Sequence, residues 1–371
     1  MPSSPSIEVS GIHIRRLVVP FRRPLNTRVG QFSEGPFLAI DLDLKGGGNA
    51  RLLGFTFNRL GLTVVPPLLE ALAAFAKGRS ISTETIGDFH DACERHLHLL
   101  GNEGVCQMAR SMFDMLLYDG LARAAGVPLY RLLGGTNAPI PAYNSCGLGL
   151  LNADAAAREA VELRDANGGF KHIKMRLGRD AVGDDVAAIE SVRAAIGPDI
   201  KLSADFNQGL SSRVALDVCR AIDHLGLTWI EEPVVYDDYP TQARLARKLV
   251  TPIQIGENWW SWRVGKMAIE MGAADLVMPD ILRIGGVTGW KRLAAVAEQN
   301  AVPFSSHISP DYSAHLMGVT PTADWLEFMD WGQDVLRDPV LPEAGFVRPS
   351  ERDGAGLEWD EAALQKCVVD A

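Results

Sequence analysis

From about residue 139 onward, the chain alternates short apolar runs with segments of helical periodicity. The clearest helical segment, 184–196, ends at Gly197-Pro198, because proline cannot continue a helix and glycine caps one well. Eight apolar runs separated in this way predict an α/β fold with a parallel (β/α) barrel rather than an open doubly wound sheet. The predicted strands are 140–145, 172–176, 201–205, 228–231, 253–257, 275–279, 303–307 and 325–328.

The first part of the chain has a different order, with strands first and helices afterwards. Apolar runs at 12–14, 17–19 and 37–44 predict strands, and the polar, glycine-containing stretch 21–35 predicts a loop between them. After a glycine turn at 46–48 we expect helices, the longest at 64–77 and 103–125. This order indicates an α+β domain. The domains expected are 1–135 (α+β), 136–340 (barrel) and 341–371, a tail that packs back on the first domain.

Composition narrows the class of protein. A net charge of −10 argues against a nucleic-acid or anionic-membrane partner. No apolar run is long enough to span a bilayer, and the first five residues lack the pattern of an export signal. The five cysteines are scattered and odd in number, as expected of reduced thiols in a cytoplasmic protein.

Three acidic residues close successive barrel runs at equal intervals. Asp205, Glu231 and Glu257 follow one another at 26-residue steps. Because the carboxyl ends of parallel strands lie on one face of a barrel, we expect these carboxylates to converge. Converging carboxylates repel one another unless a cation lies between them, and oxygen ligands favour Mg²⁺, with Mn²⁺ possible. The spacing therefore predicts a divalent metal site.

Other polar residues end the neighbouring runs, and they include cations, a histidine and further carboxylates. Lys174 and Arg176 are two positions apart on one strand, so both are expected to face the barrel mouth. Asp280 could orient His307 as a base. The full set is Ser145, Lys174, Arg176, Asp280, His307 and Glu327.

These residues lie in motifs that resemble the mandelate racemase subgroup of the enolase superfamily over essentially the whole chain. Any one motif is weak evidence, but together and in this order they are specific. The matching stretches are Trp229-Ile230-Glu231-Glu232-Pro233, Gly256-Glu257-Asn258-Trp259, Met278-Pro279-Asp280, Ile284-Gly285-Gly286-Val287-Thr288-Gly289-Trp290, Ser305-Ser306-His307 and Trp325-Leu326-Glu327.

The resemblance implies a modified TIM-like barrel, (β/α)7β, with an α+β capping domain that the C-terminal tail completes. It implies that Asp205, Glu231 and Glu257 bind Mg²⁺. Strand alternation lets only one of Glu231 and Glu232 face inward, and the choice of Glu231 rests on the resemblance. The family also implies a homo-oligomer, with an octamer possible.

The resemblance further implies abstraction of the proton next to a substrate carboxylate. His307, paired with Asp280, would be the acid/base, and Lys174 and Glu327 would hold the carboxylate. Asn207 is similar to a family residue that contacts the substrate near the metal. Glu327 must be protonated to donate a hydrogen bond, so we expect its pKa to be raised by burial and neighbouring carboxylates.

The chain departs from the racemase pattern at one position. Racemases of the subgroup have K-x-K on the second barrel strand, whereas this chain has Lys174-Met175-Arg176. Arginine is a poor base, because it stays protonated at any working pH. Arg176 could instead clamp a carboxylate, pair with a metal ligand or act as an atypical base. One conventional base, His307, favours dehydration of a hydroxy-carboxylate or sugar acid over racemisation.

The expected pocket lining disagrees with a sugar acid as the substrate. Leu25 and Phe32 on the N-terminal loop, with Ile308 and Met329 near the last strands, suggest a partly apolar small-molecule carboxylate substrate, whereas sugar acids need polar contacts. Ser145 is a further candidate substrate contact. Three functions stay open: a Mg²⁺-dependent dehydratase, a racemase or epimerase of a 2-hydroxy acid, and a non-catalytic metal-bound sensor or scaffold.

Overall fold

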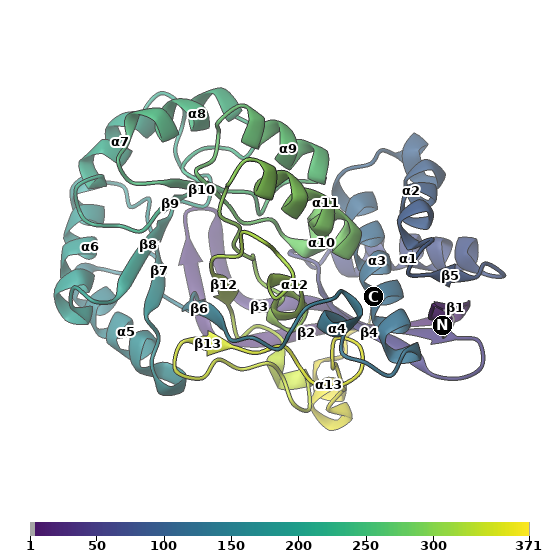
Figure 1. Cartoon of the computed structure of the whole chain (residues 1–371). Coiled ribbons are helices and arrows are strands. Elements are labelled where there is room, and N and C mark those ends of the chain that lie inside the picture. The colour runs from purple at the N-terminus through teal and green to yellow at the C-terminus, as the bar shows by residue number, and fades with distance from the viewer. Residues whose placement is uncertain (1–3, 371) are drawn as a thin grey trace.

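The larger part of the chain folds as a barrel of parallel strands surrounded by helices, in a computed structural model that describes residues 4–370 (Figure 1). The expectation of no export signal concerned the first five residues, and residues 1–3 of these lie outside the described residues. The strand order is β11-β10-β9-β8-β7-β6-β12. The strands are β6 Ile140–Asn144, β7 His172–Arg176, β8 Lys201–Asp205, β9 Ile230–Glu231, β10 Ile253–Ile255, β11 Leu276–Val277 and β12 Leu326–Phe328.

The eighth predicted strand, 303–307, is present only as bridges between its neighbours. Phe304 pairs in parallel with Val277 and with Ala323, so this segment closes the barrel between β11 and β12. Its backbone N–H groups donate alternately to the segment before β12 and to β11. Pro303 has no N–H, so it cannot extend this pattern of hydrogen bonds. The barrel itself is confirmed, with seven continuous strands.

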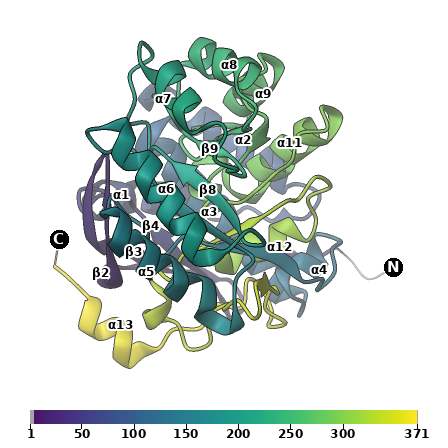
Figure 2. The same cartoon turned by 90° about the vertical axis from the view of Figure 1, so that its left-hand side faces the viewer.

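Helices cover the outside of the barrel, and α5, α6 and α7 are seen in front of the strands in Figure 2. The predicted helix 184–196 is α6, which ends at Ile196 and is capped by Gly197 (φ 82°). The outer helices are α5 Ala153–Asp165, α6 Val182–Ile196, α7 Ala215–Ile222, α8 Tyr239–Lys248, α9 Trp262–Glu270, α11 Gly286–Gln299 and α12 Pro310–Met317. The short ones are α4 Leu129–Leu132, α10 Ile281–Ile284, and the 3-10 turns Ala166–Gly168 and Gln333–Val335.

An antiparallel sheet and a group of helices form the capping part of the fold. The sheet is β2 Val9–Thr27, β3 Gly30–Leu44 and β4 Asn49–Phe55, and a second pair is β1 Ser6–Ile7 with β5 Ile81–Ser82. The helices are α1 Gly61–Ala76, α2 Ile86–Leu97 and α3 Gly104–Ala124, with the 3-10 turn His98–Leu100. Helix α3 is buried on nearly every side, because it packs between α1, β4 and the barrel helices α10 and α11.

The predicted loop at 21–35 is wrong. Strands β2 and β3 continue through it as one long hairpin, in which Leu25 pairs with Phe32 and Thr27 with Gly30. The polar composition hid a strand in which Phe21, Leu25 and Thr27 are buried and the residues next to them are more exposed. The helices expected directly after the glycine turn are preceded by another strand, β4, which the sequence analysis missed.

The C-terminal tail packs back on the rest of the fold, as expected. Strand β13, Phe346–Val347, pairs with barrel strand β6. Helix α13, Glu361–Cys367, lies against β2, and Val368 bridges Leu17. The tail therefore contacts both parts of the fold, with β13 on the barrel and α13 against the capping sheet. The exact domain boundaries stay a prediction.

Two further features of the described residues bear on the class of protein. All five cysteines are free, and four of them are buried. Within residues 4–370, no helix combines the length and the apolar character needed to cross a membrane.

Candidate active site

The three predicted metal ligands converge at the carboxyl ends of adjacent strands. Asp205 ends β8, Glu231 ends β9, and Glu257 follows β10 by two residues. One oxygen from each carboxylate lies within 4.8 Å of those of the other two. The short turn before Glu257 depends on Gly256, whose φ is 140° and whose Cβ would lie 3.1 Å from the Met278 backbone nitrogen.

Lys174 is the cation that enters this acidic cluster from β7. Its Nζ lies 2.5 Å from Glu231 Oε1, 2.8 Å from Glu327 Oε1 and 3.5 Å from Asp205 Oδ2. Burial lowers the pKa of Lys174, but the three carboxylates outweigh burial and hold the pKa above its ordinary value. The surrounding carboxylates therefore favour the charged form of Lys174.

One lysine does not neutralise the acids. Burial raises the pKa of Glu231 to about 8 despite the charge of Lys174, and the neighbouring Asp205 carboxylate adds to the rise. Burial likewise raises the pKa of Glu257. A carboxylate cluster that resists ionisation, made only of hard oxygen ligands, fits a divalent cation such as Mg²⁺.

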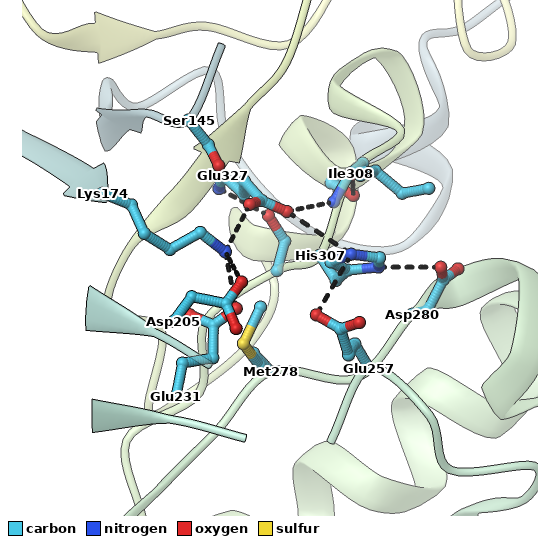
Figure 3. Close-up of polar contacts among 12 residues, drawn as sticks. Ser145, Lys174, Asp205, Glu231, Glu257, Met278, Asp280, His307, Ile308 and Glu327 are labelled. Carbon is cyan, nitrogen blue, oxygen red and sulfur yellow. Dashed lines mark hydrogen bonds and ion pairs between the residues drawn. The ribbon is translucent and has the colours of Figure 1, made fainter. Parts of the chain in front are cut away.

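His307 reaches the cluster from the opposite side to Lys174 (Figure 3). Its Nδ1 lies 2.8 Å from Asp280 Oδ2, and its Nε2 lies 3.4 Å from Glu257 Oε2. The other oxygen of Asp280 accepts a hydrogen bond from the backbone of Leu282 and caps α10. Burial lowers the pKa of His307, but the carboxylates of Glu257, Glu327 and Asp280 together raise it to about 9. Asp280 fixes the ring so that Nε2 faces the cavity.

Glu327 lies between Lys174 and His307 and contacts both. Burial raises its pKa, but the charges of Lys174 and His307 and hydrogen bonds from Lys174 and the Ile308 backbone lower it overall. The predicted raised pKa is therefore wrong in this structure. Both carboxylate oxygens accept hydrogen bonds, one from Lys174 and one from the Ile308 backbone, which fits an ionised group.

Arg176 lines the cavity, and both terminal nitrogens of its guanidinium are hydrogen-bonded to the protein. It donates to the backbone oxygens of Ser145 and Gly147 at 2.9 and 2.8 Å and to Ser145 Oγ at 2.9 Å. These hydrogen bonds fix the loop after β6, and a guanidinium that stays protonated is a poor base. Ser145 is fully buried behind Arg176 and does not line the cavity, so the structure gives no support to direct substrate contact by Ser145.

Family membership follows from the sequence. A model of the family described as Enolase C-terminal domain-like matches residues 155–363, more than half of the chain. The chain belongs to this family.

Several known proteins are similar to this chain over most or all of its length. An enolase from an alpha proteobacterium, bal199, solved with bound magnesium, is 38% identical, covers 98% of this chain and 100% of its own, and has a TM-score of 0.95. An enolase from Bradyrhizobium, complexed with magnesium and mandelic acid, is 36% identical with a TM-score of 0.93 and covers 100% of both chains. The L-talarate/galactarate dehydratase of Salmonella typhimurium is 30% identical over 298 residues, 78% of this chain and 74% of that protein.

Other relatives of this enolase-superfamily chain include cycloisomerases, racemases and epimerases. Structures of the mandelate racemase and muconate lactonizing enzyme group share its fold. The resemblance to that group is confirmed, and the chain is an enzyme of the superfamily. Membership alone leaves the reaction open, because the relatives carry out several.

A cavity of about 240 Å³ lies over the cluster of this enolase-superfamily enzyme. Four predicted lining residues, Leu25, Phe32, Ile308 and Met329, do line it. So does Asn207, whose backbone and side-chain nitrogens donate to the two oxygens of Asp205 at 2.7 and 2.9 Å. The Asn207 side-chain oxygen is buried without a partner among the described residues, as expected where a ligand approaches.

Sequence reasoning missed two charged residues of the cavity. Glu232 lines the cavity although strand alternation excluded it, because its φ of 38° ends the alternation directly after β9. Arg283 donates to the Glu257 backbone oxygen and to Asn258, and its guanidinium stacks 3.8 Å from the centre of the Phe57 ring. A left-handed residue directly after β9 brings Glu232 into the cavity, and only the structure shows it. Nothing local in the sequence indicates the position of Arg283 either.

Proposed function

We propose that this enzyme removes the proton next to the carboxylate of a hydroxy acid, with His307 as the base, and that the reaction is dehydration. The observation that carries the proposal is the pairing of His307 with Asp280, which leaves Nε2 facing the cavity 3.4 Å from Glu257. Asp205, Glu231 and Glu257 would hold Mg²⁺, which supplies positive charge to stabilise the negative charge that develops on the substrate carboxylate.

The residues of the chain then have separate tasks. Lys174 places a fixed positive charge beside the site of the substrate carboxylate, and Glu327 holds Lys174 and the Ile308 backbone in position. Asp280 keeps the His307 ring in the tautomer whose Nε2 accepts the proton. Asn207 holds Asp205 and presents its free oxygen to the cavity.

Dehydration is preferred because His307 is the one histidine among the described residues that line the cavity. Racemisation takes a proton from one face and returns one to the other. The side chains on β7 are unsuited to the second step, since Lys174 is held charged by three carboxylates and Arg176 is bonded to the loop after β6. After His307 removes the proton, it can return the proton to the departing hydroxyl group.

Exchange in D₂O tests the proposal. With Mg²⁺ and a set of 2-hydroxy and 2,3-dihydroxy acids, NMR should show loss of the α-proton signal, and semicarbazide should trap a 2-oxo acid. With the His307→Asn variant, the α-proton signal should persist and no 2-oxo acid should be trapped. Conversion of a substrate into its enantiomer with no oxo acid would favour the racemase alternative. Unchanged exchange in the variant would refute the role of His307. A cytoplasmic location and a homo-oligomer stay predictions.

A further inference from the structure

The cavity has two chemically different sides. Its floor carries the acids, Lys174 and His307, whereas its cover comes from the capping domain and is almost entirely hydrocarbon. We name this cover the apolar canopy, and it consists of Leu25, Val29, Phe32, Phe55 and Phe57. Ile308, Met329 and Trp331 extend the same apolar surface from the barrel side.

Two polar groups beside the canopy, the Thr27 hydroxyl and one terminal nitrogen of Arg283, already have partners in the protein, whereas Arg283 Nε has none among the described residues. The Thr27 hydroxyl donates to the Gly30 carbonyl and accepts from the Val29 backbone, both at 3.2 Å. Arg283 lies between the rings of Phe57 and Trp260 and donates to the Glu257 backbone oxygen. Any hydroxyl group of a polyhydroxy substrate that lies against the five canopy side chains would face hydrocarbon without a hydrogen-bond partner, which is unfavourable.

The canopy is held firmly in place. Phe55 packs against Phe57 and Trp331 with ring centres 4.7 and 5.6 Å apart, and Trp331 stacks on Phe21 at 4.3 Å. At the tip of the hairpin, the carbonyl of Asn26 accepts a hydrogen bond of 2.7 Å from the backbone of Leu150, in the barrel. A rigid apolar surface binds a flat or branched apolar group with little loss of conformational freedom.

The size of the cavity limits the substrate. About 240 Å³ is just below the usual range for small-molecule pockets. The floor must also hold the carboxylate and the reacting carbons. The space that remains under the canopy suits one ring or a short branched chain and not a long one.

We propose that the substrate is a 2,3-dihydroxy carboxylate whose third carbon carries an aryl or branched alkyl group that the canopy covers. This inference rests on the proposed dehydration. It reconciles the single base, which requires a hydroxyl group on the third carbon as the leaving group, with a cover that offers hydrocarbon where a sugar acid would need hydrogen bonds.

The reaction balances without any further reactant. His307 takes the proton from C2, the electron pair forms the C2–C3 double bond, and the C3–O bond breaks. The departing hydroxide takes the proton from His307 and leaves as water. The enol that remains tautomerises, so that R–CH(OH)–CH(OH)–COO⁻ becomes R–CH₂–CO–COO⁻ and H₂O. C2 is oxidised and C3 is reduced by the same two electrons, so no external oxidant or reductant is needed.

The test compares 2,3-dihydroxy-3-phenylpropanoate with gluconate, using the full chain and Mg²⁺. The phenyl acid should give phenylpyruvate, detected as its semicarbazone, with a larger kcat/KM than gluconate. The Phe32→Asn and Leu25→Asn variants should lower kcat/KM for the phenyl acid on the order of 10- to 200-fold, mainly through KM. Phe346→Asn, the same change at an exposed phenylalanine on β13 outside the cavity, should leave it unchanged.

A parallel measurement separates failure of this inference from failure of the proposed function. Exchange of the α-proton of lactate and mandelate in D₂O reports on His307 without a leaving group. If exchange occurs but gluconate is dehydrated faster, or if the phenyl acid is not dehydrated, the inference is overturned and the proposed base stands. If no acid exchanges its α-proton or is dehydrated, both are overturned. Canopy variants that exchange lactate normally yet keep wild-type kcat/KM for the phenyl acid would also overturn the inference.

Discussion

Replacement of Asp280 by asparagine removes one charge from the site while keeping the shape of the side chain. Asp280 has two tasks, since one oxygen contacts His307 Nδ1 at 2.8 Å and the other caps α10 through the Leu282 backbone. Asparagine is about as good an N-cap as aspartate, so the helix should keep its cap. The variant therefore isolates the effect of the carboxylate charge on His307.

The size of the effect follows from this contact. A buried hydrogen bond to a charged group contributes roughly 1.5–3 kcal/mol. That stabilisation is available to the imidazolium formed during proton removal and is lost in Asp280→Asn, so the rate should fall by about 10- to 150-fold. The charge of Asp280 also helps to raise the pKa of His307, so the variant should have a lower His307 pKa.

The assay is the rate of α-proton exchange in D₂O, measured against pH by NMR, together with thermal unfolding. We expect the slower exchange to come with a shift of the acidic limb of the profile to lower pH and with little change in Tm. Asp360→Asn is the matched control, because Asp360 caps α13 in the C-terminal tail through Ala363. A folded Asp280→Asn variant with the wild-type rate across the pH range would refute the positioning role of Asp280.

Three further predictions test the site and the fold. Lys174→Met removes the cation that contacts three carboxylates and should lower exchange at least 100-fold even with Mg²⁺; near-normal exchange would exclude Lys174 from the site. Chelation with EDTA should abolish exchange and lower Tm, and Mg²⁺ at 100 times its Kd should restore about 2.7 kcal/mol of stability; a Tm insensitive to metal would argue against the site. Burial lowers the pKa of His315 to about 4, so its neutral ring stabilises the fold above pH 6.5, and this contribution is lost as the pH falls toward 4. In urea unfolding, His315→Asn should lose less stability than wild type over that window, by up to about 3 kcal/mol, and equal losses would contradict the assignment.

The sequence by itself determined the barrel and most of the residues that meet in the candidate site. Asp205, Glu231, Glu257, Lys174, Asp280 and His307 close or follow apolar runs, and parallel strands bring their carboxyl ends to one face whatever the details of packing. A pattern that repeats along the chain can be recognised locally. This is why the convergence of the acids and the contact between Asp280 and His307 were predictable.

Only the tertiary structure decided the groups whose position depends on distant parts of the chain. The hairpin tip reaches the barrel because its backbone bonds to Leu150, more than a hundred residues away, and its polar composition resembles a loop. Glu232 enters the cavity through one left-handed residue, which breaks strand alternation. The lowered pKa of Glu327 follows from its contacts with Lys174, His307 and the Ile308 backbone, which burial alone would not have indicated. Electrostatic balance and contacts between domains arise from three-dimensional proximity, which the order of the residues does not specify locally.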